Sequence, residues 1–190
     1  MAWNSVIRSD DANAVQLLTE NLAHLNDRNA YMQRADAYYE EHGTMKGFED
    51  LTEEQAFKVD AYVGGEQTTP YENFRIDNRK SAERIHKNID RVMNEPHTLF
   101  QGWQFEGGEA IVNLANNRLQ LMFNKKPSEE LRNQLKRSGF VWASKAEAWQ
   151  RPLIRKAFEA ANRIYAIKPL DGRKVMDLQP KAPQCDAPER

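Results

Sequence analysis

Hydrophobic residues recur at alternating steps of three and four between residues 9 and 42, which is the spacing of a heptad repeat. Polar Asn29 occupies the position between the last two members of this stripe. Ser9 is a candidate N-cap, and Gly43 is a candidate C-terminal stop. The pattern predicts a helix of about eight turns, whose apolar stripe must pack on another helix of the chain or on a second copy. The stripe consists of Val15, Leu18, Leu22, Leu25 and Met32.

Two more helices are predicted before Pro96. Thr52 and Gln55 form a capping-box pattern that opens a short helix, and the glycines at 64 and 65 would end it. A third helix is expected over residues 78–94, with Pro96 beyond its end. Its apolar stripe is Ala82, Ile85, Ile89 and Val92.

After Pro96 the hydrophobic pattern changes to period two, which is typical of β-strands. Gly107 with Gly108 predicts a tight hairpin turn, and Asn116 with Asn117 predicts a second turn. Strands are expected at residues 100–106, 110–114, 118–123, 140–144 and 148–153.

Two helices are predicted in this second half. Ser128 would cap the first, which carries acidic residues in its first turn, basic residues in its last and Gly139 at its end. The second is expected over residues 154–167. The predicted fold class is therefore α+β: a helical module with a long helix (1–96), a small antiparallel sheet packed with two helices (97–168), and a flexible Pro-rich tail (169–190).

Composition limits the classes of protein that the chain can belong to. Hydrophobic residues make up 40% and charged residues 29%, which is typical of a globular chain. The sequence has no apolar run near the roughly 20 residues that cross a bilayer, and it lacks a secretory signal pattern. Its single cysteine, Cys185, excludes an intramolecular disulfide framework. We expect a cytoplasmic protein of a bacterial host, without a membrane partner.

Charge is distributed unevenly although the net charge is only -1. Residues 1–50 carry 4 basic and 9 acidic residues, whereas residues 118–168 carry 12 basic and 4 acidic residues, a surplus of 8. A local surplus of this kind attracts polyanions. The other interpretation is an ordinary solvated basic surface.

Recognisable catalytic patterns are missing from the sequence. It has neither a phosphate-binding Gly-x-x-x-x-Gly-Lys-Ser/Thr loop nor a dinucleotide fingerprint, and its four histidines lack the spacing of a zinc site. No serine stands in a nucleophile elbow. The chain is therefore predicted not to be an enzyme and to need no cofactor or metal.

The basic stretch supplies the candidate binding residues. Lys and Arg side chains neutralise phosphates and release counterions, so clustered cations are expected to bind nucleic acid. The candidates are Arg118, Lys125, Lys126, Arg132, Lys136, Arg137, Lys145, Arg151, Arg155 and Lys156.

Aromatic residues lie within the same stretch. Phe140 and Trp142 alternate with Val141 and Ala143, which is typical of a half-buried hairpin that packs its rings on a helix. The alternative is that an exposed ring such as an indole stacks an unpaired base, an interaction worth roughly 1 to 3 kcal/mol.

These stretches carry a resemblance that runs from about Asn29 to Ala166. Its most specific block is a Gly-Phe-x-Trp motif followed by Ala-Trp-Gln-Arg. The chain resembles a family of largely uncharacterised domains encoded by phages and conjugative elements, often joined to antirestriction domains or DNA methyltransferases in large multi-domain proteins. The matching stretches are residues 29–31, 42–48, 102–108, 117–123, 126–132, 135–142 and 148–151.

The resemblance implies a phage or mobile-element origin and a role near DNA or host defence, and it supplies no catalytic residues. The chain departs from the family pattern at three positions. Val141 stands where a basic residue is usual, Ser144 where proline is usual, and Pro152 where glutamine is usual. Loss of a cation at position 141 weakens the direct phosphate contact expected there.

Three functions remain open from the sequence. The first is a non-enzymatic DNA- or RNA-binding accessory protein, for which 6 to 8 contacted phosphates would give a log-log salt slope on the order of -5 to -7. The second is a phage anti-defence inhibitor, of the anti-CRISPR or antirestriction type, that contacts a host nuclease complex. In it, Asp36, Glu40 and Glu41 would imitate a phosphate backbone. The third is a homodimeric scaffold in which Asn29 sets the helix register.

Overall fold

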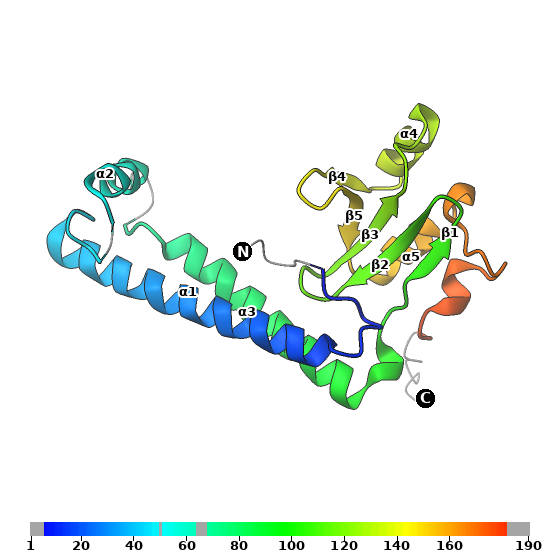
Figure 1. The fold of residues 1–190 in the computed structure, drawn as a ribbon, viewed down its shortest axis with the longest axis horizontal. Helices are drawn as coiled ribbons and strands as arrows, with labels where there is room; N and C mark the ends of the chain where they lie inside the picture. The colour runs from blue at the N-terminus through cyan, green and yellow to red at the C-terminus, as the bar shows by residue number, and fades with distance from the viewer. Residues whose placement is uncertain (1–5, 50, 64–67, 182–190) are drawn as a thin grey trace, which may run out of the picture. The chain divides into compact units, whose positions relative to one another are not determined.

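A computed structural model describes residues 6–49, 51–63 and 68–181. The fold class is α+β, as predicted: a long N-terminal helix and other helices accompany a small antiparallel sheet (Figure 1). Contacts within the chain divide it into two compact units, one of residues 19–87 and one of residues 1–18 and 88–190. This division differs from the predicted boundary at Pro96, because chain on both sides of residues 19–87 joins the sheet.

The first unit contains most of α1 (Ala14–His42), all of α2 (Glu53–Tyr62) and the first part of α3 (Glu72–Asn94). A capping box opens α2, as predicted: the Thr52 hydroxyl accepts from the Gln55 backbone N–H at 3.2 Å, and the Gln55 side chain accepts from the Thr52 N–H at 2.9 Å. Gly64 and Gly65, which were predicted to end this helix, lie outside the described residues.

Ser9 is not the N-cap of α1, which begins at Ala14. The Ser9 backbone N–H donates to the Val112 carbonyl at 3.2 Å, and the Ser9 hydroxyl donates to the Phe100 carbonyl at 3.0 Å. Chain near Ser9 therefore hydrogen-bonds to the sheet unit instead of opening a helix. Gly43 adopts φ 66° directly after α1, in agreement with its predicted role as the stop.

The helix α3 begins at Glu72, six residues before the predicted start at 78. Its first turns carry Phe74 and Ile76, both exposed, so they lack the buried stripe by which the rest of the helix is recognised. A small core completes this unit, with tyrosines at its edge. It is formed by Ala35, Met45, Phe48 and Ala56.

The second unit is built on a five-stranded antiparallel sheet in the order β1-β2-β3-β5-β4 (Figure 1). All five predicted strands are present: the strand at residues 118–123 has the predicted bounds, and the other four have shifted ends. They are β1 (Trp103–Phe105), β2 (Gly108–Asn113), β3 (Arg118–Phe123), β4 (Val141–Ala143) and β5 (Ala148–Pro152).

The first hairpin turn lies one residue earlier than predicted. Phe105 pairs with Gly108, so Glu106 and Gly107 form the turn, and Gly107 adopts φ 81°. Gly108 belongs to β2, where a Cβ would lie 2.2 Å from the Met122 carbonyl oxygen and 2.7 Å from the Phe105 ring. Glycine is therefore needed at position 108 for space and at 107 for backbone conformation.

One face of the sheet is apolar. Leu119 and Leu121 are fully buried, and Trp149 of β5 pairs with Leu121 and so shares this face. Phe158 of α5 (Arg155–Ala161) lies 6.2 Å from Trp103 of β1, measured between ring centroids. The opposite face carries a polar ladder, in which Asn113 donates to Gln120 and Gln120 donates to Gln150.

Both predicted helices of this unit form. Ser128 caps α4 (Glu129–Arg137) by accepting from the Leu131 N–H at 3.2 Å, and Gly139 follows the helix with φ 79°. The last predicted helix, 154–167, divides into α5 and a 3-10 turn at Tyr165–Ile167. This turn still buries Ile167 in the core.

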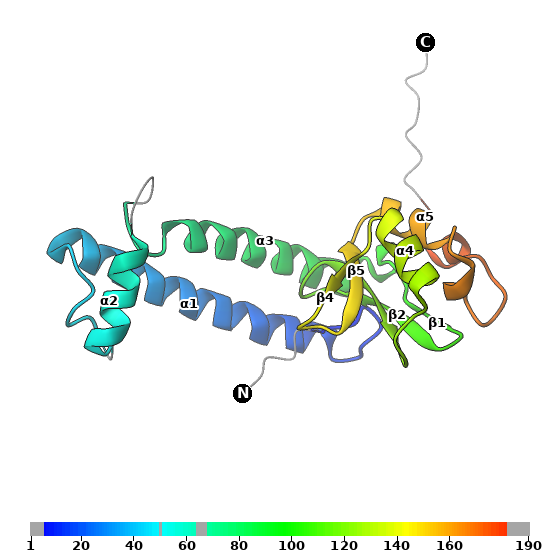
Figure 2. The same ribbon diagram turned by 90° about the horizontal axis from the view of Figure 1, so that it is seen from above.

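Residues 169–181 do not form the flexible tail predicted from their proline content. In both ribbon views this segment, drawn in orange to red, lies beside the sheet unit (Figures 1 and 2). Pro169 forms a β-bridge with Phe105, and Gln179 exchanges two hydrogen bonds with the backbone of Gln101. Val175 is buried at 1% exposure. Residues 182–190 of the predicted tail lie outside the described residues.

Candidate functional site

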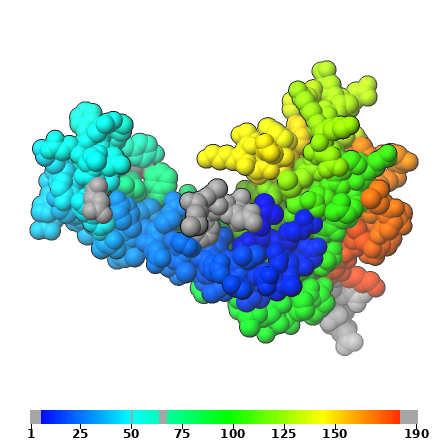
Figure 3. Space-filling view, viewed as in Figure 1, coloured from blue at the N-terminus to red at the C-terminus, as the bar shows by residue number. Residues whose placement is uncertain are grey.

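The candidate site lies where three elements of the sheet unit meet. The strand β3 ends at Phe123, a loop of residues 124–127 leads into α4, and the hairpin of β4 and β5 supplies the opposite side. In the space-filling view the tip of this hairpin, drawn in yellow, projects from the surface (Figure 3). Each element is fixed by local chemistry, since Ser128 caps α4 and strand pairing holds the hairpin.

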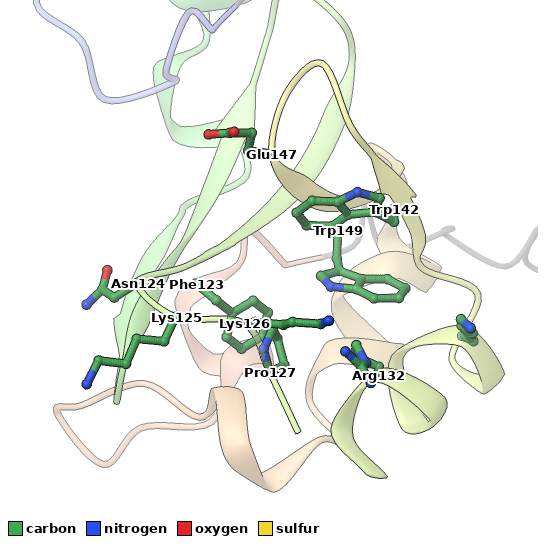
Figure 4. Close-up of a pocket in the computed structure, with 10 residues that line it drawn as sticks. Phe123, Asn124, Lys125, Lys126, Pro127, Arg132, Trp142, Glu147 and Trp149 are labelled. Carbon is green, nitrogen blue, oxygen red and sulfur yellow. The ribbon is translucent and has the colours of Figure 1, made fainter. Parts of the chain in front are cut away.

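These elements enclose a pocket of about 600 Å³, a size typical of sites that hold small organic ligands. Figure 4 shows its lining, which combines cationic and aromatic side chains. The lining residues are Phe123, Asn124, Lys125, Lys126, Pro127, Arg132, Lys136, Trp142, Glu147 and Trp149.

Four cations line the pocket from two sides. Lys125 and Lys126 come from the loop after β3, and Arg132 and Lys136 come from α4, where a spacing of four places them on one helix face. Within the described part of the chain, none of the four forms an ion pair with a carboxylate. Glu147 is the one acidic residue in the lining, so the pocket carries a formal charge of +3, four cations less one carboxylate.

The side chains of these cations point in different directions. In Figure 4 Lys126 extends toward the indole rings, whereas Lys125 points away from them. Glu147 belongs to the turn between β4 and β5 and lies apart from the cations. The inner part of the pocket therefore combines positive charge with aromatic surface.

Two indoles form the aromatic side. Trp142 and Trp149 are direct partners across β4 and β5, and their ring centroids lie 5.8 Å apart at an interplanar angle of 58°. Trp149 is 4% exposed, because it shares the apolar face of the sheet with Leu121. Trp142 is 48% exposed, because β4 is the edge strand. The sequence left open whether the rings of this stretch pack in the core or are exposed for stacking. Trp149 packs in the core, whereas the ring of Trp142 is half exposed.

A second hollow, of about 390 Å³, lies next to the pocket. It shares Lys136, Trp142 and Trp149 with the first and adds Gly139, Phe140 and Val141. The two indoles therefore border open space in two places.

Arg151 is a structural residue and does not line the pocket. Its guanidinium donates to the carbonyl of Ser138, directly after α4. A Cβ at Gly139 would lie 3.2 Å from the same guanidinium. Arg151 thus ties the end of α4 to β5 and helps to position the helix that carries Arg132 and Lys136.

Five other predicted cations also lie outside the pocket. Arg118 donates to the carbonyl of Asn117 at 3.3 Å. Arg155 donates to the carbonyl of Pro180 at 3.1 Å and lies 3.7 Å from Glu159. The remaining three, Arg137, Lys145 and Lys156, are exposed at the end of α4, in the β4–β5 turn and on α5. The structure therefore brings together four of the ten predicted cations.

Sequence reasoning did not single out Phe123, Asn124 and Glu147 as site residues. The period-two pattern of residues 118–123 puts Phe123 on the same face as Leu119 and Leu121, which indicates a core residue, and its ring packs on Phe105 with centroids 5.1 Å apart. Glu147 adopts φ 48° in a tight turn, so its place in the pocket depends on the hairpin geometry. For Phe123 and Asn124, the one signal in the sequence is that they directly precede Lys125.

The predicted acidic surface on α1 loses one of its three members. Asp36 is 2% exposed, and its carboxylate accepts from the Tyr71 backbone N–H at 2.8 Å and from Arg75 at 3.0 Å. It therefore cannot imitate a phosphate on the protein surface, and its role is to hold α3 to α1 within residues 19–87. Glu40 and Glu41 are exposed at the end of α1.

The heptad stripe of α1 is already largely covered in one chain. Leu18, Leu22 and Met32 are each buried, while Leu25 and Asn29 are partly exposed. A second copy of the chain is therefore not needed to remove this stripe from water.

The described residues hold no group of three or more His, Cys, Asp or Glu side chains placed to bind a metal ion. Among the described helices, none combines the length and the hydrophobicity of a membrane span.

Comparison of the chain with protein-family models, curated proteins and solved structures finds no match.

Proposed function

We propose that this protein is a non-enzymatic nucleic-acid-binding accessory protein and that the cationic and aromatic pocket is its binding site. One observation carries the proposal: four cations without a carboxylate partner among the described residues line a pocket that also contains a half-exposed indole. The resemblance to domains of phages and conjugative elements is in keeping with a role near DNA, and we propose that the protein serves such an element.

Electrostatics favours a polyanion in this pocket. The cations approach from the loop after β3 and from α4, so neighbouring phosphates of one strand could contact both sides. Each contact would release a condensed counterion, which is the main source of affinity in sequence-independent binding. Arg132 adds a planar fork that can hold a phosphate through two hydrogen bonds.

Aromatic surface distinguishes nucleic acid from other polyanions. An acidic peptide would satisfy the lysines but would leave the Trp142 ring without a partner, whereas nucleotides carry a base beside each phosphate. Ion-pair chemistry alone would not require an indole beside Lys126 and Lys136. The combination therefore supports nucleic acid over an acidic protein.

The test compares two double variants that remove the same charge. Lys126→Ala with Lys136→Ala removes two pocket cations, and Lys145→Ala with Lys156→Ala removes two exposed cations outside it. In filter-binding titrations at low salt, the first pair should lose most of the retained DNA or RNA and the second should behave as wild type. The proposal fails if wild type retains no nucleic acid, or if both pairs lose retention equally.

A further inference from the structure

Trp142 occupies a position from which it could contact a ligand directly. It lies on the edge strand β4, it is half exposed, and the buried ring of Trp149 supports it from the neighbouring strand. Strand pairing fixes the backbone of both residues. The Trp142 ring therefore offers a flat apolar surface, fixed in position, beside the cations of the pocket.

We propose that the pocket selects single-stranded nucleic acid, with an unpaired base stacked on Trp142 and neighbouring phosphates on Lys126 and Lys136. This inference rests on the proposed function and goes beyond it by naming the form of nucleic acid that is bound.

The chemistry of duplexes supports this selection. In a duplex both faces of each base are covered by its neighbours, so a protein meets base edges in the grooves and phosphates along the backbone. A single strand exposes the faces of its bases, and stacking on an aromatic side chain needs such a face. A surface built to contact duplex phosphates alone would gain nothing from the exposed half of Trp142.

The two hollows extend the argument from one nucleotide to a strand. The larger contains Lys126, the smaller runs along Gly139 and Val141, and Trp142 and Lys136 border both. A chain of nucleotides could therefore continue from one hollow to the other past the Trp142 ring. A free mononucleotide would fill only one of them.

The test uses two apolar replacements of the same ring. Trp142→Phe keeps an aromatic face, and Trp142→Leu keeps apolar volume without one, so a difference between them reports stacking rather than folding. Tyr165→Leu is the matched control, because Tyr165 is an aromatic residue that is 80% exposed and lines neither hollow. The probes are a fluorescein-labelled oligothymidylate of about 12 nucleotides, within the site sizes of single-strand-binding domains, and a blunt duplex of equal length.

Fluorescence anisotropy should show tighter binding of the single strand than of the duplex by wild type. Trp142→Leu should weaken single-strand binding by about 5-fold or more, which corresponds to the loss of one base stack. Trp142→Phe and Tyr165→Leu should retain most of the affinity. Duplex binding should be nearly the same in all four proteins.

Equal affinity of wild type for both probes, with no effect of Trp142→Leu, would overturn this inference and leave the proposed function standing. Displacement of the labelled strand by thymidine monophosphate at concentrations similar to those of unlabelled strand would also overturn it, since the site would then take a free nucleotide. Binding of neither probe at low salt would refute the proposed function itself.

Discussion

The salt dependence of binding measures how many cations contact phosphates. For a single strand, the slope of log affinity against log salt is about -0.7 for each neutralised phosphate. The slope should be shallower than the -5 to -7 expected from the sequence for two reasons: each phosphate of a single strand contributes less than the roughly -0.9 of a duplex, and Arg118, Arg151 and Arg155 donate to backbone carbonyls instead of lining the pocket. Four pocket cations therefore give a slope of about -3. Between about 50 and 200 mM salt this slope corresponds to an approximately 50-fold loss of affinity.

Variants locate the source of this slope. Lys126→Ala with Lys136→Ala should change it to about -1.4, whereas Lys145→Ala with Lys156→Ala should leave it near -3. The assay is an anisotropy titration of labelled oligothymidylate at several potassium chloride concentrations. A wild-type slope of -5 or steeper, or a larger change in the second variant than in the first, would show that phosphates bind outside the pocket and would refute the assignment.

Three further changes test the structure and the pocket separately. Asp36→Ala should lower the free energy of unfolding, measured in urea, by about 2 kcal/mol, because it removes the hydrogen bonds to a buried carboxylate. Glu40→Ala is the exposed control, and an equal loss of stability in both variants would contradict the role given to Asp36. Gly108→Ala should lower the melting temperature, at a cost of about 1–3 kcal/mol, because the new Cβ meets backbone and ring atoms; an unchanged melting temperature would contradict that packing. Glu147→Gln should raise single-strand affinity by roughly 1.5- to 5-fold by removing the pocket carboxylate, and an affinity below that of wild type would count against a polyanion ligand.

Local chemistry explains which parts of the fold could be predicted. The capping box at Thr52, the cap at Ser128 and the positive φ angles at Asn117 and Gly139 each depend on a few neighbouring residues. Period-two patterning located the strands for the same reason. The observed ends of an element differ from the predicted ones where an exposed hydrophobic residue interrupts the pattern of buried positions, as Phe74 does in α3.

Contacts between distant segments could not be read from the sequence. Residues 7–9 and 169–179 bind the sheet through isolated bridges and backbone hydrogen bonds, which leave no periodic signal. Proline content made the second segment resemble a tail, although Gln179 and Val175 are buried. A count of apolar residues cannot detect order that depends on a few buried groups.

The candidate site was predicted as a region but not as a set of residues. The local charge surplus covers the stretch that contains Lys125, Lys126, Arg132 and Lys136, and these four residues line the pocket. Which cations line the pocket depends on the strand order β3-β5-β4, because that order places the hairpin beside the loop after β3. Arg151 had the expected charge but is held by a backbone carbonyl.

The indole N–H signals of the protein offer the most direct test of the pocket. Trp142 borders the pocket, whereas the Trp103 indole N–H donates to the carbonyl of Ile167 at 2.7 Å inside the core. In an NMR titration with oligothymidylate, the Trp142 signal should shift with the binding curve while the Trp103 signal stays in place. Saturable binding that leaves the Trp142 signal unmoved would place the nucleic acid elsewhere on the protein and contradict the account.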